Sequence, residues 1–391
     1  MEGSRRSDRI ATLRRRAAAV AVALAVTAGL WLVIGRSDSG DDGGGRAPGV
    51  TAPVVGLVAE LSTDELADQV LLLGFDGSDS SAAFLDEVGS RQLGGVMIGA
   101  QNWPDSSTGT ALVDAIREAG ATDGRVPPLI ATAQEGGAYR SLFDMPPAET
   151  ELAIGDTASP DAAERWAAQT CAALASAGFH LNLFPVADVA TLDSAVADRA
   201  FSDDPAIAAQ LTAAAVRGCR QEGIAPAALH FPGLGAASQD TSQGPATVSL
   251  DAASLAARDL EAFRAAFAER VPAVVLSLAF YAAYDPVTPG ALAAPVATGL
   301  LRDELGFEGL AITDDLGSGA VRSGDPVPKA AVQALIAGAD LLQIGSATDQ
   351  GGVHEAIVDA VASGELSEAR LTEAAGRVLE LKRRQSLVDF D

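Results

Sequence analysis

The sequence predicts an α/β fold of the (β/α)8 TIM-barrel type in a single domain. From Leu61 onward, short apolar segments alternate with amphipathic, Ala-rich stretches. Nearly continuous apolar runs are typical of parallel strands that are buried on both faces. Seven or eight such units over roughly 330 residues suit a closed barrel, although the pattern alone also permits an open doubly wound sheet.

The N-terminal part predicts one transmembrane helix ahead of the barrel. Residues 17–35 are apolar and uncharged, and at about 1.5 Å per residue they just span a hydrocarbon core of about 30 Å. The Arg cluster in residues 1–16 predicts a cytoplasmic basic segment and an extracytoplasmic barrel, in a single-pass protein of the cell membrane. A cleaved signal peptide, which would give a secreted protein, is the alternative to this uncleaved signal anchor. The Arg cluster argues against a buried helix of a soluble protein.

A linker is expected between this segment and the barrel. Residues 36–55 are rich in Gly, Ser and Asp and predict a disordered tether, which places the barrel at residues 56–385. Its first helix begins at the capping box of Ser62 and Glu65 and is expected to run into residues 70–75. The strands expected after it are Gly94–Ile98, Pro128–Thr132, Leu181–Pro185, Ile224–Phe231, Ala273–Leu278, Leu310–Asp314 and Asp340–Ile344. The helices expected between strands include residues 161–177, 205–222 and 252–269.

The charge of the chain argues against nucleic acid as a partner. The formal net charge is −25, and so acidic a surface repels the phosphates of DNA and RNA. The glycine pairs at residues 94–95 and 136–137 lack the further spacing of a phosphate-binding loop or a dinucleotide fingerprint.

The two cysteines, Cys171 and Cys219, both lie in expected helices. Outside the cytoplasm they are able to form a disulfide between two neighbouring helices on the outside of a barrel. Two buried free thiols are the alternative. Neither cysteine has metal-ligand spacing with a His, so no metal site is expected.

Polar side chains gather where the expected strands end. They are Gln134 and Glu135, Asp188, His230, and the pair Asp314 and Asp315. Active sites of α/β barrels lie at the carboxyl ends of the strands. The sequence therefore predicts a functional site at this end of the barrel.

Ordered motifs occur at these same strand ends. They are Gly94–Gly99, Ala133–Gly137, Leu181–Val189, Asp198–Pro205, His230–Gly235 and Glu304–Leu316, followed by the segments Ala337–Leu342 and Ala369–Lys382. Together they resemble the bacterial β-N-acetylhexosaminidases of glycoside hydrolase family 3, and the first motif resembles the first strand of that family's barrel. The resemblance covers residues 61–382.

The resemblance implies a covalent, retaining mechanism in which a carboxylate attacks the anomeric carbon and a second group protonates the leaving oxygen. It makes Asp314 the nucleophile and Arg199, His230, Glu135 and Asp315 the residues that bind the sugar. The family's chemistry uses protein side chains only, so no cofactor is implied. On the residues alone, Asp314 can instead be a structural Asp bonded to loop amides, and His230 a satisfied core residue.

The sequence departs from the family at several site positions. Apolar residues replace the Asp, Lys or His of the family at Ala133, Leu229, Leu234 and Leu278. The family's acid/base is the His of an Asp-Ser-His triplet, but this chain has Asp240-Thr241-Ser242. A Ser hydroxyl does not supply a proton near neutral pH. Asp240 is therefore the possible acid/base, if burial raises its pKa, or the remnant of a lost catalytic dyad.

Two functions fit these observations. The first is a retaining glycosidase that hydrolyses terminal β-linked N-acetylhexosamine in cell-wall glycan or a peptidoglycan fragment, impaired by the loss of the loop His. The alternative is a catalytically degenerate family member, a pseudoenzyme that binds glycan or protein at the cell surface. The feature that discriminates between the two functions is whether the Asp240-Thr241-Ser242 loop and the polar side chains of the site still support hydrolysis.

Overall fold

A computed structural model describes residues 49–78, 82–121, 125–191 and 193–388. Their centre is a nearly closed barrel of eight parallel strands, ordered β10-β7-β5-β4-β3-β2-β1-β11. The two end strands approach each other through a parallel bridge between Ile312 and Leu341. The barrel strands are β1 (Leu71–Leu73), β2 (Gly95–Met97), β3 (Leu129–Thr132), β4 (Leu181–Asn182), β5 (Ala225–Phe231), β7 (Ala273–Leu276), β10 (Leu310–Thr313) and β11 (Leu342–Ile344). This arrangement confirms the α/β barrel and leaves no room for the open doubly wound sheet.

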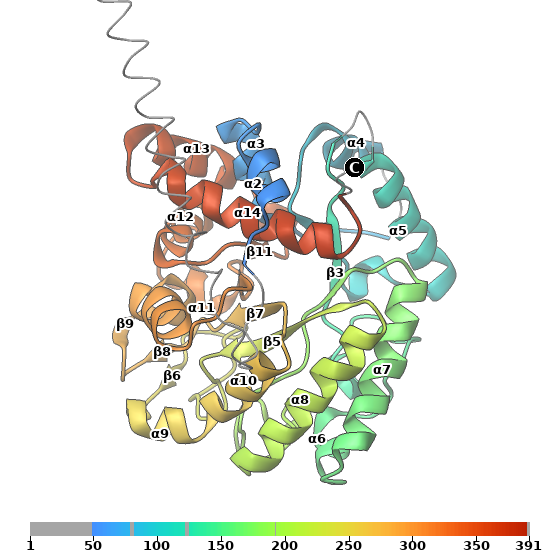
Figure 1. Ribbon diagram of the computed structural model, residues 1–391, viewed down its shortest axis with the longest axis vertical. Coiled ribbons are helices and arrows are strands. Elements are labelled where there is room, and N and C mark those ends of the chain that lie inside the picture. The colour runs from blue at the N-terminus through green and yellow to red at the C-terminus, as the bar shows by residue number, and fades with distance from the viewer. Residues whose placement is uncertain (1–48, 79–81, 122–124, 192, 389–391) are drawn as a thin grey trace, which may run out of the picture. The chain divides into compact units, whose positions relative to one another are not determined.

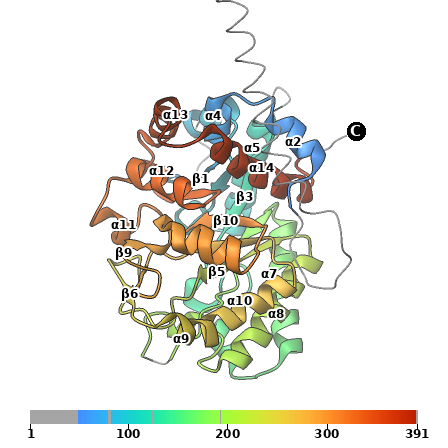
Figure 2. The same cartoon turned by 60° about the vertical axis from the view of Figure 1, so that its left-hand side comes forward.

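Helices surround the strands (Figure 1 and Figure 2). Each crossover between parallel barrel strands contains a helical segment, as parallel pairing requires. The outer elements are α3 (Thr63–Gln69), α4 (Ala82–Ser90), α5 (Ser106–Gly120), α7 (Pro160–Ser176), α8 (Pro205–Gln221), α10 (Asp259–Ala268), η6 (Pro295–Glu304), α12 (Val327–Ala337), α13 (Val353–Ser363) and α14 (Glu368–Arg384). Strand residues facing both the barrel interior and the helices are buried, for example all seven residues of β5.

The first barrel strand was missed by the sequence analysis. Helix α3 begins at the expected capping box of Ser62 and Glu65 but ends at Gln69. The three Leu of β1 then pair with β2 on one side and β11 on the other. The expectation that the helix runs into residues 70–75 is therefore wrong, and Gly94–Gly99 carries the second strand rather than the first.

A second correction concerns the helix expected over residues 252–269. It is two helices, α9 (Ala252–Ala257) and α10, because Arg258 leaves the helical region at φ −113° and ψ −95°. The Arg258 guanidinium donates a hydrogen bond to the Val189 carbonyl at 2.7 Å. The break places Asp259, the first residue of α10, in a fully buried position.

The N-terminal predictions fall largely outside the described residues. This applies to the basic segment 1–16, to the expected anchor 17–35 and to most of the linker. In the part of the chain that the structure describes, no helix is long and apolar enough to cross a membrane. The linker expected over residues 36–55 ends earlier than predicted, because Ala52–Val58 forms helix α2 and Val54 is fully buried.

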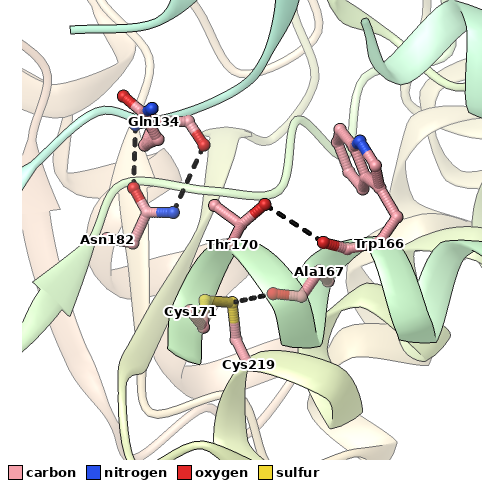
Figure 3. Close-up of a disulfide and its surroundings, with 7 residues drawn as sticks. All are labelled: Gln134, Trp166, Ala167, Thr170, Cys171, Asn182 and Cys219. Atoms are coloured by element: carbon pink, nitrogen blue, oxygen red, sulfur yellow. Dashed lines mark hydrogen bonds between the residues drawn. A yellow bond between two sulfur atoms is a disulfide. The ribbon is translucent and has the colours of Figure 1, made fainter. Parts of the chain in front are cut away.

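A disulfide joins Cys171 on α7 to Cys219 on α8, the pairing considered from the sequence (Figure 3). The two Cα atoms are 5.1 Å apart. The helices approach closely beside the bridge, since a Cβ atom added to Gly218 would lie only 2.3 Å from the Glu164 carbonyl oxygen. The bridge therefore ties two neighbouring outer helices together.

Loops at the carboxyl ends of the strands carry additional structure. A three-stranded sheet consists of β6 (Thr247–Val248), β8 (Phe280–Tyr281) and β9 (Asp285–Pro289). These strands belong to the connections after β5 and β7. The short elements η4 (Ala197–Arg199), α6 (Glu151–Gly155) and α11 (Gly319–Arg322) lie in the connections after β4, β3 and β10.

Candidate active site

The most extensive polar contact at this end of the barrel joins Arg199 to Glu135. Glu135 follows β3, and Arg199 ends η4 after β4. The guanidinium donates to both carboxylate oxygens, from Nε at 2.7 Å and from Nη2 at 2.8 Å. The exposed fractions of the two side chains are only 12% and 7%. A bidentate pair with so little exposure fixes the direction of both side chains.

His230 continues this network from the end of β5. Its Nδ1 lies 2.8 Å from Oδ2 of Asp188, and its Nε2 lies 3.1 Å from Nη2 of Arg199. The fully buried Asp188 also accepts main-chain hydrogen bonds from His230 at 3.2 Å and Leu234 at 2.7 Å. Since a guanidinium only donates, the ring that fits this geometry is neutral, with its proton on Nδ1.

The pKa of His230 depends on this placement. Burial and the charge of Arg199 disfavour the imidazolium form, but the carboxylates of Asp188 and Asp314 together bring the pKa of His230 above its ordinary value. A protonated ring would set its own N–H against an N–H of Arg199. Protonation of His230 therefore requires the guanidinium to move.

Asp314 follows β10 and lies half-buried in the wall of a pocket. Its Oδ1 accepts a hydrogen bond from the Asp315 main chain at 2.8 Å, and its Oδ2 accepts one from the Thr241 hydroxyl at 3.4 Å. The pocket has a volume of about 530 Å³. It is lined by Ser242, Asp314, Asp315, Gly317, Ser318, Gly319 and Arg322. The Asp314 carboxylate thus borders a space large enough for a sugar ring.

Asp315 has a different role from its neighbour. Its Oδ1 accepts main-chain hydrogen bonds from Gly317 at 2.9 Å and Gly345 at 3.0 Å. Burial raises the pKa of Asp315 above its ordinary value. These contacts connect the loops after β10 and β11, so Asp315 shapes the pocket as well as lining it.

The loop with Asp240, Thr241 and Ser242 is held by its main chain. The Thr241 carbonyl accepts from the Ala320 amide at 3.1 Å, and the Ser242 carbonyl accepts from the Gly319 amide at 3.2 Å. Both amides belong to the first turn of α11. The loop is thereby fixed beside Asp314.

The side chain of Asp240 is ionised in this position. Its Oδ1 accepts the Ser242 amide hydrogen at 2.8 Å, and its Oδ2 lies 3.8 Å from Nη1 of Arg199. Burial raises the pKa of Asp240, but the hydrogen bonds from Ser242 and the charge of Arg199 bring it below the ordinary value. The condition for Asp240 to act as the acid, a pKa raised by burial, is not met here.

The six residues singled out from the sequence all lie at the carboxyl ends of the strands. Contacts connect five of them to one another or to the Asp240 loop: Glu135, Arg199, His230, Asp240 and Asp314. Asp315 joins through its main-chain bond to Asp314. The apolar replacements Leu229, Leu234 and Leu278 are buried in the hydrophobic core.

Sequence reasoning missed four residues that contact or flank this site. Asp188 was noted only as a strand-end residue, and Thr241 only as part of a triplet. Glu151 and Asp259 are buried carboxyls, and burial raises the pKa of Glu151 well above its ordinary value and that of Asp259 to about 7. One oxygen of each carboxyl has no hydrogen-bond partner among the described residues. Only Asp188 carried a sequence signal, its place after an apolar run.

His180 lies at the opposite end of the barrel from the site. It precedes β4, and its Nδ1 accepts a hydrogen bond from the Ile130 main chain at 3.0 Å. Burial lowers the pKa of His180 to about 4. His180 is therefore a neutral residue of the barrel's amino-terminal end.

Comparison with known proteins assigns the family. The model of the glycosyl hydrolase family 3 N-terminal domain matches residues 62–381. The chain belongs to glycosyl hydrolase family 3. The match spans the whole barrel, including every residue of the site described above.

Relatives of this family share both sequence and fold with the chain. A beta-hexosaminidase of Stenotrophomonas maltophilia (strain K279a) is 32% identical over 319 residues, which are 79% of this chain and 91% of that protein. The family 3 beta-N-acetylglucosaminidase of Paenibacillus sp. str. FPU-7 superposes with a TM-score of 0.81 at 29% identity, over 84% of this chain and 63% of that longer one. The beta-N-acetylhexosaminidase of Beutenbergia cavernae DSM 12333 gives a TM-score of 0.73 at 29% identity, over 83% and 99% of the two chains. These relatives are named as hydrolases and lend no support to a pseudoenzyme.

Proposed function

We propose that the protein is a retaining glycosidase that removes terminal β-linked N-acetylhexosamine from glycan through a covalent intermediate on Asp314. The observation that carries this proposal is the position of Asp314. Its carboxylate lies in the pocket wall, held by the Asp315 amide and the Thr241 hydroxyl. The names of the relatives, beta-hexosaminidase and beta-N-acetylglucosaminidase, support the acetamido sugar.

In the first half of the proposed reaction, an oxygen of Asp314 bonds to the anomeric carbon while the bond to the leaving oxygen breaks. The leaving oxygen needs a proton, but Asp240 is ionised and Ser242 is a poor acid. The departure of the leaving group is therefore unassisted by this loop. The leaving oxygen then departs as an anion and takes its proton from water, so we expect slow turnover of glycan and faster turnover of substrates whose leaving group is stable as an anion.

In the second half, water attacks the glycosyl-enzyme and releases Asp314. This step needs a base to take a proton from the water. An ionised Asp240, kept so by Arg199 and the Ser242 amide, suits that role. The loop thus fits the second half of a retaining mechanism better than the first.

We further propose that the substrate lies outside the cytoplasm, as cell-wall glycan or a fragment of peptidoglycan. The proposal rests on residues 17–35, whose apolar sequence after an Arg cluster suits a membrane anchor. The partner is then glycan or a peptidoglycan fragment rather than a nucleic acid, consistent with the net charge of −25. Cleavage of the anchor would give a secreted enzyme with the same site.

The test is turnover of 4-nitrophenyl N-acetyl-β-glucosaminide by the full-length chain. We expect release of nitrophenol that is lost in Asp314→Ala and kept in Asp325→Ala, which removes a surface carboxylate paired with Lys329. Proton NMR should show the β-anomer of the sugar as the first product. A fluorinated substrate analogue should leave a covalent sugar on the peptide that contains Asp314. No release above that of Asp314→Ala, or an α-anomer first, would reject the proposal.

A further inference from the structure

The first described residues of the chain are bound to the amino-terminal end of the barrel. The amide and the hydroxyl of Thr51 donate hydrogen bonds to Oε2 of Glu380 on α14, at 3.2 Å and 2.8 Å. A Cβ atom added to Gly49 would lie 3.6 Å from Oε2 of Glu308. Glu308 comes just before strand β10, whereas Asp314 comes directly after it. The chain thus reaches the barrel at the end opposite to the pocket of Asp314.

Helices α14 and α2 cover this end of the barrel. Arg370 of α14 donates to Oδ1 of Asp340, just before β11, at 2.8 Å, and Lys382 of α14 donates to the Leu93 carbonyl, just before β2, at 2.7 Å. Helix α2 lies beside α14 (Figure 1 and Figure 2). Its Val54 is buried in the hydrophobic core. Helix α2 is therefore an outer layer of the amino-terminal end.

The outer face of α2 is uncharged. Residues 52–59 include no Asp, Glu, Lys or Arg. Ala52, Pro53, Gly56 and Ala59 are exposed. In a chain with a net charge of −25, such a face is one that anionic lipid headgroups do not repel.

The outer helices carry acidic residues at the site end and basic residues at the amino-terminal end. Asp105 caps the start of α5, and Arg117 lies in its last turn. Asp204 caps the start of α8, and Arg220 lies in its last turn. Both signs suit the helix dipole. Because each of these helices leads from the end of one barrel strand to the start of the next, an anionic bilayer would repel the site end and attract the other.

The segment between the proposed anchor and the barrel is short. Residues 36–48, thirteen in number, separate residues 17–35 from the first described residue. A Gly-rich tether of that length has a root-mean-square extension of about 20 Å and a maximum of about 45 Å. Helix α8, with 17 residues, alone spans about 25 Å between the two ends of the barrel. Most conformations of the tether are therefore too short to pass along the barrel and bring the site end to the bilayer.

We propose that the amino-terminal end of the barrel, with the outer face of α2, is the surface that faces the lipid bilayer, so that the site opens away from the membrane. This inference rests on the proposed function and its membrane anchor, and it adds the side from which the substrate comes. Glycan on the far side of the protein reaches Asp314. The headgroup of a glycolipid in the same bilayer does not.

The test is resonance energy transfer from one fluorophore on the barrel to a rhodamine lipid, with the full-length chain in vesicles of phosphatidylcholine and phosphatidylglycerol. Ser107→Cys and Ala121→Cys are a matched pair of labelling sites, since both residues are small and exposed and lie at the two ends of α5. Cys171 and Cys219 are bridged and do not take the label. We expect transfer from Ala121→Cys to be about twofold higher than from Ser107→Cys, because α5 separates the two labels by about 20 Å.

Equal transfer from the two positions, or higher transfer from Ser107→Cys, would overturn the inference. A chain that does not float with the vesicles would overturn both the anchor and the inference. Turnover of 4-nitrophenyl N-acetyl-β-glucosaminide in the same vesicles tests the glycosidase separately. Loss of that turnover together with unequal transfer would reject the function and leave the orientation of the barrel in place.

Discussion

Asp240 and Arg199 lie 3.8 Å apart, as Oδ2 and Nη1, while the other oxygen of Asp240 accepts the Ser242 amide hydrogen. Both contacts favour the ionised carboxylate, and the pKa of Asp240 is below its ordinary value despite burial. The loop to which the family resemblance assigns the acid therefore holds an ionised carboxylate in this protein. This relationship determines how the two halves of the proposed reaction should respond to mutation.

The rate should depend strongly on the leaving group. Because no acid assists its departure, kcat/KM for a series of aryl N-acetyl-β-glucosaminides should fall steeply as the pKa of the released phenol rises. General acid catalysis is worth roughly 100- to 10,000-fold, so the poorest phenols should lose that much relative to an assisted enzyme. The measurement is a plot of log kcat/KM against phenol pKa. A flat plot would mean that another group donates the proton.

Asp240→Asn should slow the second half of the reaction. Removal of the base is expected to cost about 100-fold in hydrolysis of the glycosyl-enzyme, while its formation from a dinitrophenyl glycoside should change little. Stopped-flow measurement should then show a burst of phenol equal to the enzyme concentration, followed by slow turnover. Asp325→Asn, at the surface, serves as the control. A loss of the burst itself would place Asp240 in the first half instead.

Ser242→His should restore an acid to the loop. Since the Gly319 and Ala320 amides hold the loop through its main-chain carbonyls, the new side chain need not alter the loop. We expect kcat/KM on the β-1,4-linked disaccharide of N-acetylglucosamine to rise about tenfold, part of the full value of a general acid, with little change on a dinitrophenyl glycoside. Ser242→Gln provides bulk without an acid and should give no gain. Equal effects of both replacements would point to packing rather than proton transfer.

Asp259→Asn should change how stability depends on pH. Burial, aided by the charge of Asp188, raises the pKa of Asp259 to about 7, above its unfolded value near 3.8. The folded protein then holds a proton that the unfolded chain releases, so stability falls as pH rises from about 4 to about 7. The effect is on the order of 4 kcal/mol at most. The free energy of unfolding, measured in urea between pH 4 and pH 8, should fall less steeply with pH in Asp259→Asn than in the wild type. The slope that is left in the variant should come from Glu151, whose pKa is raised in the same direction. Identical slopes would mean that Asp259 is ionised throughout.

The double variant Cys171→Ser, Cys219→Ser should be less stable than the oxidised protein. The bridge closes a loop with a sequence separation of 48, and the chain-entropy model gives about 4 kcal/mol for that length. The free energies of unfolding measured in urea for the wild type with and without reductant should differ by a similar amount. A variant that matches the oxidised wild type would show that the thiols are not bridged in solution.

The barrel was predictable because each buried parallel strand leaves an apolar run, as at Leu310–Thr313 and Ala225–Phe231. The three-residue strand Leu71–Leu73 was not, because its Leu residues follow helix α3 without a break and fit a helical continuation equally well. The break at Arg258 also had no local signal. It depends on a contact with Val189, 69 residues away.

The residues of the site were predictable, but their contacts were not. A strand-end position and a family motif identify Glu135 and Arg199 separately, whereas their bidentate pairing joins residues 64 apart in the chain. The sequence made the acid role of Asp240 depend on whether burial raises its pKa. In the structure the Ser242 amide and Arg199 lower this pKa instead. Such effects depend on side-chain directions, which residue order alone does not specify.

The bonds from the Gly319 and Ala320 amides to the loop have an evolutionary consequence. They engage carbonyl oxygens, which every amino acid has, so these two bonds do not depend on the side chain of residue 242. A lineage can therefore exchange the side chain there and keep the two bonds between this loop and helix α11. Changes in substrate range and turnover can then arise at that position while these two bonds remain.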